Sequence, residues 1–351
     1  MALKVVYLFG AGATQAVLRS STSLSLLTAD IQTKIEGQYS SRGFNNKVWS
    51  ELTTTGNDVE HLISVLETQH NYYASEKIRK YYRDAIVDIS NPISISPPLK
   101  NLYSVLIDLH NIKDLGEELQ CLMTLNYEDI LENTIKKIFK LPIDYCLHPN
   151  KNISLKDPVK ILKLHGSFSW QNTRPISVRK MKSISSANTL WIPPGVDKKK
   201  DNYPFNYLWG QAVENLLECD ILRVVGCSLS RNDWALIPIL YTVQKFNESG
   251  KVLDIEIIDF PATAEKIIDN YRYIKFKKIT ELPEFIGFYK KLFPAASTAD
   301  VITEINNKFI DKAKANPFYE WLDSKLDYLY DDKLIDISTP KKIAYNFYHK
   351  I

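Results

Sequence analysis

Four turns in this sequence carry residue types that could do chemistry, and each follows an apolar run. They begin at Gly10, Asn126, His165 and Gly226. An asparagine amide donates and accepts hydrogen bonds, so it can orient a ligand or a water molecule. A histidine side chain titrates near neutral pH, so it can accept a proton. Glycine turns that lead into helices suit phosphate groups, because helix N-termini offer N–H groups and a positive dipole end.

Each of these residues also has a purely structural explanation. An asparagine after a strand often caps the next helix, and a histidine at a strand end is often hydrogen-bonded within the core. The first glycine turn lacks the third glycine of the G-x-G-x-x-G fingerprint, because Gln15 stands there. Taken singly, none of the four turns identifies a function.

The elements that must position these turns are strands alternating with helices. Apolar runs predict strands at 3–9, 120–124, 160–164, 221–225 and 252–258. Helical spacing of apolar residues predicts helices from 57 to about 91 with a break, at 102–109, 125–137, 205–218 and 233–246. This alternation is typical of a parallel sheet with helices on both faces, in which ligands bind at the carboxyl edge. We therefore predict an α/β, Rossmann-like fold.

Three further segments complete the predicted organisation. The helices between 57 and 109 form a helical insertion, and the polar stretch 174–188 is expected to be a surface excursion. Beyond about residue 282, aromatic residues at helical spacing predict a helical C-terminal tail. We predict a catalytic domain over 1–285 and a helical extension over 286–351.

Composition limits the classes of protein to consider. Of the 351 residues, 45% are hydrophobic and 24% are charged, which is ordinary for a globular protein. The formal net charge of +3 is too small to indicate nucleic-acid binding. No apolar run is long enough to span a bilayer, and Gly10 interrupts the apolar opening, so we expect a cytoplasmic protein without a membrane partner.

The cysteines give no indication of a metal. Cys121, Cys146, Cys219 and Cys227 include no C-x-x-C pair, which excludes a zinc site of paired thiolates. Cys146 forms a C-x-H pair with His148, but no further ligands accompany it. We expect no metal.

In this order, the segments G-A-G-A-T, T-L-N-Y-E-D, K-L-H-G-S and V-G-C-S-L-S-R-N-D resemble the SIR2, or sirtuin-like, superfamily. They look most like its prokaryotic SIR2-like NADases, which are effectors of anti-phage defence. The resemblance extends to Leu190–Pro194, Leu208-Trp209, Ala212 and Asp220, and covers residues 1–280.

The resemblance implies that the chain binds NAD as its substrate. It implies that Asn126 holds the nicotinamide ribose and a catalytic water, and that His165 is the catalytic histidine. The remaining implied contacts are with the pyrophosphate, with a second phosphate and ribose, and with the adenine ribose: Gly10, Ala11, Gly12 and Thr14; Gly226 and Ser228; and Asp259. From the residues alone, Ser228 could mark only a tight turn and Asp259 could cap a helix.

The sequence departs from the sirtuin deacetylases in two segments. It lacks their G-I-P-D-F-R segment after the glycine turn, and it lacks their four-cysteine zinc module. In the family these parts help to form the acyl-lysine peptide cleft, so the resemblance implies hydrolysis of NAD itself. Glu128 stands where an aspartate is usual in the family, and whether Asp129 replaces it is open.

The residue types suit this reaction. Cleavage of the nicotinamide–ribose bond passes through an oxocarbenium-like state, as in glycoside hydrolysis. The leaving pyridinium already carries positive charge, so the reaction needs an oriented ribose, a positioned water and a proton acceptor rather than a strong general acid. Asn126 and His165 supply these functions.

The leading hypothesis is therefore an NAD hydrolase that depletes cellular NAD during infection. The alternatives are a catalytically silent module that binds NAD or ADP-ribose, and a SIR2-type protein deacylase or ADP-ribosyltransferase. An NAD-depleting enzyme must be held inactive in resting cells, so we expect a homo-oligomer or a regulatory partner protein from the same defence system. Large aromatic residues of the tail either form such an interface or pack back on the domain: Phe318, Tyr319, Trp321, Tyr328 and Tyr330.

Overall fold

The structure is a computed structural model, and it describes residues 2–19, 31, 35, 59–90, 103, 106–107, 110, 116–147, 157–194, 200–230, 233, 235–246, 252–259 and 261–278. The predicted helical tail and the predicted boundary at 285/286 lie outside these residues.

A sheet of seven strands forms the centre of the molecule, in the order β10-β9-β8-β1-β2-β4-β3. Every neighbouring pair in it is parallel. Its strands in chain order are β1 (Leu3–Phe9), β2 (Glu117–Thr124), β3 (Ile143–Asp144), β4 (Val159–Lys163), β8 (Ile221–Val225), β9 (Asp254–Ile258) and β10 (Phe276–Lys278). The predicted α/β, Rossmann-like fold class is confirmed.

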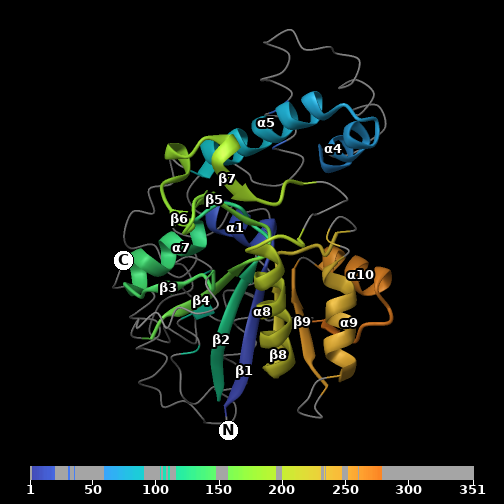
Figure 1. The fold of residues 1–351 in the computed structure, drawn as a ribbon. Helices are drawn as coiled ribbons and strands as arrows, with labels where there is room; N and C mark the ends of the chain where they lie inside the picture. Colours follow the sequence, from blue (N-terminus) through green and yellow to red (C-terminus); the bar gives the residue numbers. More distant parts are fainter. Residues whose placement is uncertain are drawn as a thin grey trace, which may run out of the picture.

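Helices cover both faces of this sheet (Figure 1). They are α1 (Ala11–Arg19), α4 (Val59–Thr68), α5 (Tyr72–Ser90), α7 (Ile130–Thr134), α8 (Phe205–Glu218), α9 (Leu236–Phe246) and α10 (Pro261–Asn270). Side chains alternate along a strand, so β1 contributes Val5, Tyr7 and Phe9 to the core beneath α1, α4, α5 and α7. It contributes Val6 and Leu8 to the core beneath α8, α9 and α10. Burial on both faces explains why β1 is apolar from Val5 to Phe9.

The helix predicted from 57 to about 91 is divided into α4 and α5. α4 ends at Thr68, and His70 adopts a left-handed backbone with φ 57°. The Asn71 side-chain oxygen then accepts a hydrogen bond from the Ala74 N–H, which caps the start of α5. The end of α4 and the start of α5 are therefore set by residues of the short segment between them.

Most of the stretch predicted as a surface excursion is exposed, and its residues 177–178 form an edge strand of a second, antiparallel sheet in the order β6-β5-β7. Its strands are β5 (Gly166–Gln171), β6 (Ser177–Val178) and β7 (Thr189–Trp191). Arg83 of α5 is buried against this sheet, and its guanidinium donates to the carbonyls of Met181 and Ile184. The predicted surface excursion is therefore confirmed for most of its length, and only Met181 and Ile184 within it are buried.

Two helices start later than their sequence patterns predict. The helix expected from residue 125 begins at Ile130, and a π-helical turn over Ile135–Phe139 continues it. The helix expected from Asp233 begins at Leu236. In both places the residues between the strand and the helix form part of the site.

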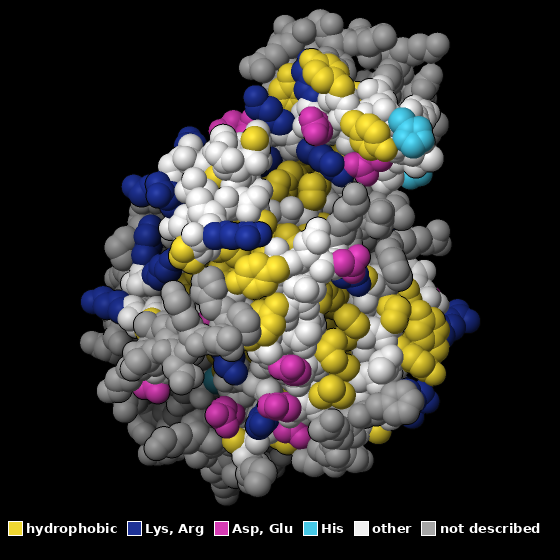
Figure 2. Space-filling model, viewed as in Figure 1, with side chains coloured by type: hydrophobic (Ala, Val, Ile, Leu, Met, Phe, Trp, Pro, Cys, Tyr) yellow, Lys and Arg dark blue, Asp and Glu magenta, His cyan; other side chains and the backbone are white. Residues whose placement is uncertain are grey.

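Figure 1 shows α4 and α5, with β5 and β7, at the end of the molecule that contains α1, opposite the N-terminus. On the face drawn in Figure 2, hydrophobic side chains gather over α9 and α10, where Tyr241 and Tyr273 are exposed and their rings touch. None of the helices in the described part of the chain combines the length and the apolar character needed to cross a membrane.

Candidate functional site

The strand ends that carry the candidate residues are aligned with one another. Thr124 of β2 pairs with Phe9 of β1 and with Lys163 of β4. Phe9 also pairs with Val225 of β8, which pairs with Ile258 of β9. The predicted site residues come one or two positions beyond this row: Gly10, Asn126, His165, Gly226 and Asp259. The prediction that they share the carboxyl edge of one sheet is confirmed.

The two glycine turns pack against each other at the centre of this edge. The strand order reverses between β1 and β8, and open α/β sheets bind ligands at such a switch point. The Gly12 N–H donates to the Gly226 carbonyl at 2.8 Å, and the Gly10 N–H donates to the Val225 carbonyl at 3.1 Å. A Cβ on Gly226, whose φ is +54°, would lie 2.1 Å from the Ala13 nitrogen.

This packing corrects one expectation about the first turn. The N–H groups of Gly10 and Gly12 are not free for a phosphate, because both donate to the second turn. Gly12 lacks a side chain because the backbone of Gly226 occupies that space. The exposed members of the two turns are Ala11 and Ser228, so these are the residues that a ligand at the edge would meet first.

Asn126 is held with its amide in one orientation. Its Nδ2 donates to the Gly10 carbonyl and to Thr14 Oγ1, each at 2.9 Å. Because a backbone carbonyl can only accept, the nitrogen must be on that side, and both of its hydrogens are used. Both of these hydrogen bonds, to Gly10 and Thr14, use Nδ2, so Oδ1 is the atom that Asn126 offers to a ligand.

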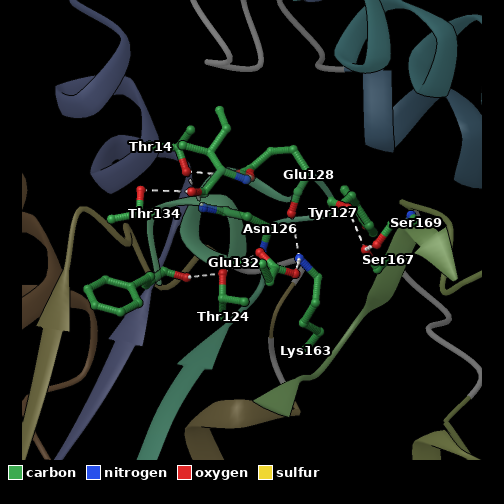
Figure 3. A network of polar contacts seen from close by, with 12 residues as sticks. Thr14, Thr124, Asn126, Tyr127, Glu128, Glu132, Thr134, Lys163, Ser167 and Ser169 are labelled. Atoms are coloured by element: carbon green, nitrogen blue, oxygen red, sulfur yellow. Dashed lines mark hydrogen bonds and ion pairs between the residues drawn. The ribbon is translucent and has the colours of Figure 1, made fainter. Parts of the chain in front are cut away.

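Thr14 and Glu128 fix this orientation of the Asn126 amide (Figure 3). Thr14 is 0% exposed, and its hydroxyl lies 2.6 Å from Glu128 Oε1 and 2.6 Å from the Tyr103 hydroxyl. Thr14 accepts from Asn126, so it donates its own proton to Glu128. The hydroxyl is thus fully used within the protein, and it meets a ligand only through Asn126.

Glu128 is an unusual acid for a protein interior. It is 3% exposed, and its Oε2 accepts from the Ile130 N–H at 2.9 Å. Burial raises its pKa, although attraction to Lys163 and the hydrogen bond from Thr14 act in the opposite direction. Burial also raises the pKa of Asp129, with repulsion from Glu132 as the next cause. Glu128 therefore meets Thr14 and the start of α7, whereas Asp129 stands at the N-cap position of α7 without a side-chain capping hydrogen bond.

The K-L-H-G-S segment clamps the backbone around Asn126. The Tyr127 carbonyl accepts from Ser167 Oγ at 3.1 Å and from the Phe168 N–H at 3.0 Å. The Glu128 carbonyl accepts from Lys163 Nζ. These bonds use the backbone that a helix starting at residue 125 would need, which explains why α7 begins later.

Lys163 is itself buried beside a second carboxylate. Its Nζ lies 2.8 Å from Glu132 Oε1, and both side chains are 1% exposed. Glu132 Oε2 has no hydrogen-bond donor among the described residues. The ammonium thus joins the end of β4 to the first turn of α7 and fixes the distance between the two turns that carry Asn126 and His165.

His165 sits in a tightly held turn. Its carbonyl accepts from the Ile192 N–H at 2.8 Å, and the carbonyl of Leu164 accepts from the Trp209 indole at 3.0 Å. Gly166 has φ +78°, and a Cβ there would lie 2.5 Å from the Leu190 carbonyl. The segment Leu190–Pro194 and Trp209, which the sequence resemblance had marked, therefore hold the histidine turn in place.

The His165 ring lies between aromatic side chains and faces one carboxylate. It stacks on Tyr127 with ring centres 6.0 Å apart, and the Trp209 ring lies 6.4 Å away. Its Nε2 lies 3.6 Å from Asp233 Oδ1. The side chain is 4% exposed, so it contacts a ligand only within the site and not from the surface.

The cysteines and acids form no metal site in the described residues. No group of three or more His, Cys, Asp or Glu side chains there is placed to hold a metal ion. Cys121, Cys219 and Cys227 are buried free thiols, and Cys146 is partly buried. His148, the other half of the C-x-H pair, lies outside the described residues.

Comparison with known proteins gives only distant matches. No family model matches the chain, and no curated protein matches it. The chain is similar to solved Sir2 structures. A Sir2 homologue in complex with NAD is 14% identical, covers 80% of this chain and 84% of its own, and gives a TM-score of 0.37. Sir2Tm bound to a propionylated peptide is 14% identical, with 80% and 88% coverage and a TM-score of 0.37.

A third structure, described as a basis for the mechanism and regulation of Sir2 enzymes, is 10% identical. It covers 88% of this chain and 92% of its own, with a TM-score of 0.35. With identities and TM-scores this low we draw nothing about activity from the likeness, and we argue from the geometry of the chain itself.

The structure adds three residues that the sequence patterns did not single out for the site: Lys163, Ser167 and Asp233. Lys163 carried a signal, since a charged residue between Leu162 and Leu164 in a buried strand needs a partner. Asp233 stood at the end of V-G-C-S-L-S-R-N-D, where it was interpreted only as the start of a helix. Ser228, Ala11 and Asp259 lie at the edge, and their contacts with a ligand stay predictions.

Proposed function

We propose that this chain is an NAD hydrolase, which converts NAD and water into ADP-ribose, nicotinamide and a proton. One observation carries the proposal: the Asn126 amide is locked, with only Oδ1 left to accept from a ligand, at the switch point of a parallel sheet. A structural cap would not need three buried side chains to fix which way its amide faces. The motif resemblance to SIR2-like NADases supports the same reaction.

The bond to be broken joins the ribose to the nicotinamide nitrogen. As it breaks, its electron pair moves to that nitrogen, positive charge grows on the ribose, and a water oxygen bonds to the ribose carbon. A fixed carbonyl oxygen favours this reaction in two ways, because it accepts a hydrogen bond from the water or the ribose and faces the growing positive charge. In this proposal Asn126 Oδ1 has that role.

His165 takes the proton that the attacking water releases. A neutral imidazole suits this step because its pKa ordinarily lies near neutral pH. Thr124 of β2 pairs with Lys163 of β4, and Asn126 and His165 each lie two residues beyond this pair. This placement supports joint action of the two side chains on one ribose.

We assign the rest of the NAD molecule to residues along the carboxyl edge of the sheet. We assign the pyrophosphate to Ala11 and the first turn of α1, and the adjoining phosphate and ribose to Ser228. Gly10, Gly12 and Gly226 contribute by letting the two turns meet, and Thr14 contributes through Asn126. Asp259, partly exposed after β9, is assigned to the hydroxyls of the adenine ribose.

The test is to incubate the purified chain with NAD and to measure released nicotinamide and ADP-ribose by chromatography, with NAD binding measured by calorimetry. Asn126→Ala should bind NAD and release almost no nicotinamide. Asn133→Ala, a nearby asparagine on α7 outside the polar network, is the matched control and should keep full activity.

Two outcomes would replace the proposal. Binding of NAD without release of nicotinamide, by the chain alone and in extracts of cells challenged with phage, would indicate a silent binding module. Release of nicotinamide only when an acylated peptide or a protein acceptor is present would indicate a deacylase or an ADP-ribosyltransferase.

We further propose that the activity depletes NAD in a bacterial anti-phage defence system and is controlled by a partner protein or by self-association. This proposal rests on the motif resemblance and on the aromatic residues beyond about residue 290. It predicts that full-length chain and a version ending near 290 differ in solution mass or in partner binding. An unchanged mass and unchanged partner binding in a folded truncation would exclude control through the tail.

A further inference from the structure

We propose that Asp233 positions and polarises His165, so that the two side chains act as a carboxylate–imidazole pair in the reaction proposed above. The carboxylate Oδ1 lies 3.6 Å from His165 Nε2. Asp233 stands 68 positions along the chain from His165 and comes from the loop that follows β8. The pair therefore exists only because the fold brings the loop after β8 to the end of β4, although β1 and β2 lie between these strands in the sheet.

Asp233 is held so that one oxygen remains for the histidine. Ser230 Oγ donates to Asp233 Oδ2 at 3.2 Å, and the Asp233 N–H donates to the Ser230 carbonyl at 2.9 Å. Oδ2 is thus committed to the turn, whereas Oδ1 faces the imidazole. The side chain is 16% exposed, so solvent screens the pair only in part.

The first part of the loop that leads to Asp233 is fixed at two points. It starts at Gly226, which packs on the first glycine turn, and Leu229 follows with a left-handed φ of 46°. The Leu229 carbonyl accepts from the Tyr271 hydroxyl at 2.8 Å. A bulky residue adopts this backbone only when its surroundings impose it, so the loop is held at Leu229, four positions before Asp233.

The His165 ring is held by contacts on its other sides as well. Tyr127 stacks on it, Trp209 lies beside it, and Lys200 lies with its Nζ 4.6 Å from the centre of the Trp209 ring. Asp233 and, beyond the indole, Lys200 are charged groups that the structure places around the imidazole. The carboxylate lies against Nε2, so it acts directly on which ring nitrogen carries the proton.

The consequence for the reaction follows from this arrangement. A carboxylate beside Nε2 favours the tautomer with the proton on Nε2, which leaves the lone pair on Nδ1 to accept a proton. When Nδ1 takes the proton from the attacking water, the imidazole becomes a cation and its attraction to Asp233 increases. The contact is thus stronger in the transition state than in the ground state, which is the condition for raising turnover.

This inference rests on the proposed function for its kinetic part. Asp233→Asn should lower kcat about 10- to 100-fold with KM changed less than twofold, because a positioning role acts on the chemical step. Asp233→Glu keeps a carboxylate and should recover part of the loss. Asp269→Asn, an exposed aspartate of α10, is the matched control and should leave kcat unchanged.

A double-mutant comparison separates this role from a structural one. In a His165→Ala background, Asp233→Asn should change the residual rate less than twofold, because its partner is gone. An equal loss of kcat in both backgrounds would overturn the proposal, as would an unchanged kcat in Asp233→Asn.

A second measurement does not need NAD cleavage. Nitrogen NMR of histidine-labelled full-length chain, with the His165 signals assigned from His165→Ala, reports which ring nitrogen carries the proton. Wild type should show the Nε2–H tautomer, and Asp233→Asn should lose that preference while the thermal midpoint stays unchanged. An identical tautomer in both would overturn the pairing, whereas failure of the chain to cleave NAD would overturn only the proposed function.

Discussion

Two buried charge clusters in this sheet have the same composition but serve different ends. Each combines one cation with two acidic residues: Arg223 is paired with Glu117 and Glu256, and Lys163 is paired with Glu132 and donates to the backbone carbonyl of Glu128. The Arg223 cluster lies within the sheet, where it joins β8 to β2 and β9. The Lys163 cluster lies at the carboxyl edge, directly beneath Asn126.

In the first cluster the groups are well satisfied. The Arg223 guanidinium donates to both oxygens of Glu117 at 2.7 and 2.6 Å, to Glu256 at 2.8 Å and to the Tyr7 hydroxyl at 3.0 Å. Burial by itself would lower the pKa of Arg223, but Tyr7 and the two carboxylates outweigh it and hold the pKa well above its usual value. Glu256 keeps 13% of its side chain exposed, so water shares its charge.

In the second cluster the groups are not fully satisfied. Glu132 is 1% exposed with one oxygen lacking a donor among the described residues, and Glu128 has a raised pKa because it is buried. Lys163 gives one of its hydrogens to a backbone carbonyl rather than to a carboxylate. We infer that the Arg223 cluster stabilises the sheet, whereas the Lys163 cluster maintains the shape of the site.

The largest effect is expected from breaking the Arg223 cluster. Arg223→Met leaves two carboxylates without their cation and should lower the free energy of unfolding by about 3–5 kcal/mol. Chemical denaturation measures this change. Arg272→Met, which removes an exposed pair with Asp269, should cost under about 1 kcal/mol. NAD turnover per folded molecule should be unchanged in both, and a selective loss of turnover in Arg223→Met would contradict the comparison.

Asn126→Ala tests the carboxyl edge near the Lys163 cluster. In contrast to Arg223→Met, it should lower turnover strongly and stability only slightly. Removing the fixed Oδ1 should lower turnover about 10²–10³-fold, the scale seen when one preorganised polar group is lost. The free energy of unfolding should fall by only about 1 kcal/mol, because one side chain with two hydrogen bonds is removed. Steady-state kinetics and denaturation on the same preparation give both numbers. Near-wild-type turnover in the folded variant would remove the catalytic assignment.

A double variant tests whether the Lys163–Glu132 ion pair contributes to stability or to the shape of the site. In Lys163→Met/Glu132→Leu an apolar pair replaces the buried ion pair, and stability should stay within about 1–2 kcal/mol of wild type or rise. Turnover should still fall about tenfold, because the Glu128 carbonyl loses the donor that holds the turn. Lys4→Met/Glu218→Leu replaces an exposed pair and serves as the control. Unchanged turnover in the buried double variant would show that the cluster is only structural.

The smallest effect concerns Glu128 and pH. Because burial raises its pKa in the native chain, the unfolded chain releases this proton first as pH rises above 4.5. The native state then binds more protons, so the free energy of unfolding declines as pH rises from 4.5 through the native pKa. Glu128→Gln should remove this decline, so thermal midpoints of variant and wild type should diverge over that range. Glu118→Gln, at an exposed position, should follow wild type throughout.

Much of the framework followed from the sequence. Strands β1 and β8 and helix α8 have the bounds that their apolar patterns predict, because residues buried on both faces of a sheet, or along one helical stripe, are mostly apolar. Parallel strands align their carboxyl ends, so the sequence also predicted that Asn126 and His165 share an edge. These are properties of single segments and of one topological rule.

The tertiary structure decided which groups meet at that edge. No local pattern shows that the Gly12 N–H is used by Gly226, that Lys163 lies against Glu132, or that Asp233 faces His165. Each of these contacts joins segments whose separation along the chain carries no periodic signal. A buried polar group needs a hydrogen-bond or ionic partner. Which residue becomes that partner depends on how the strands and loops pack, and only the folded chain brings the two groups within contact distance.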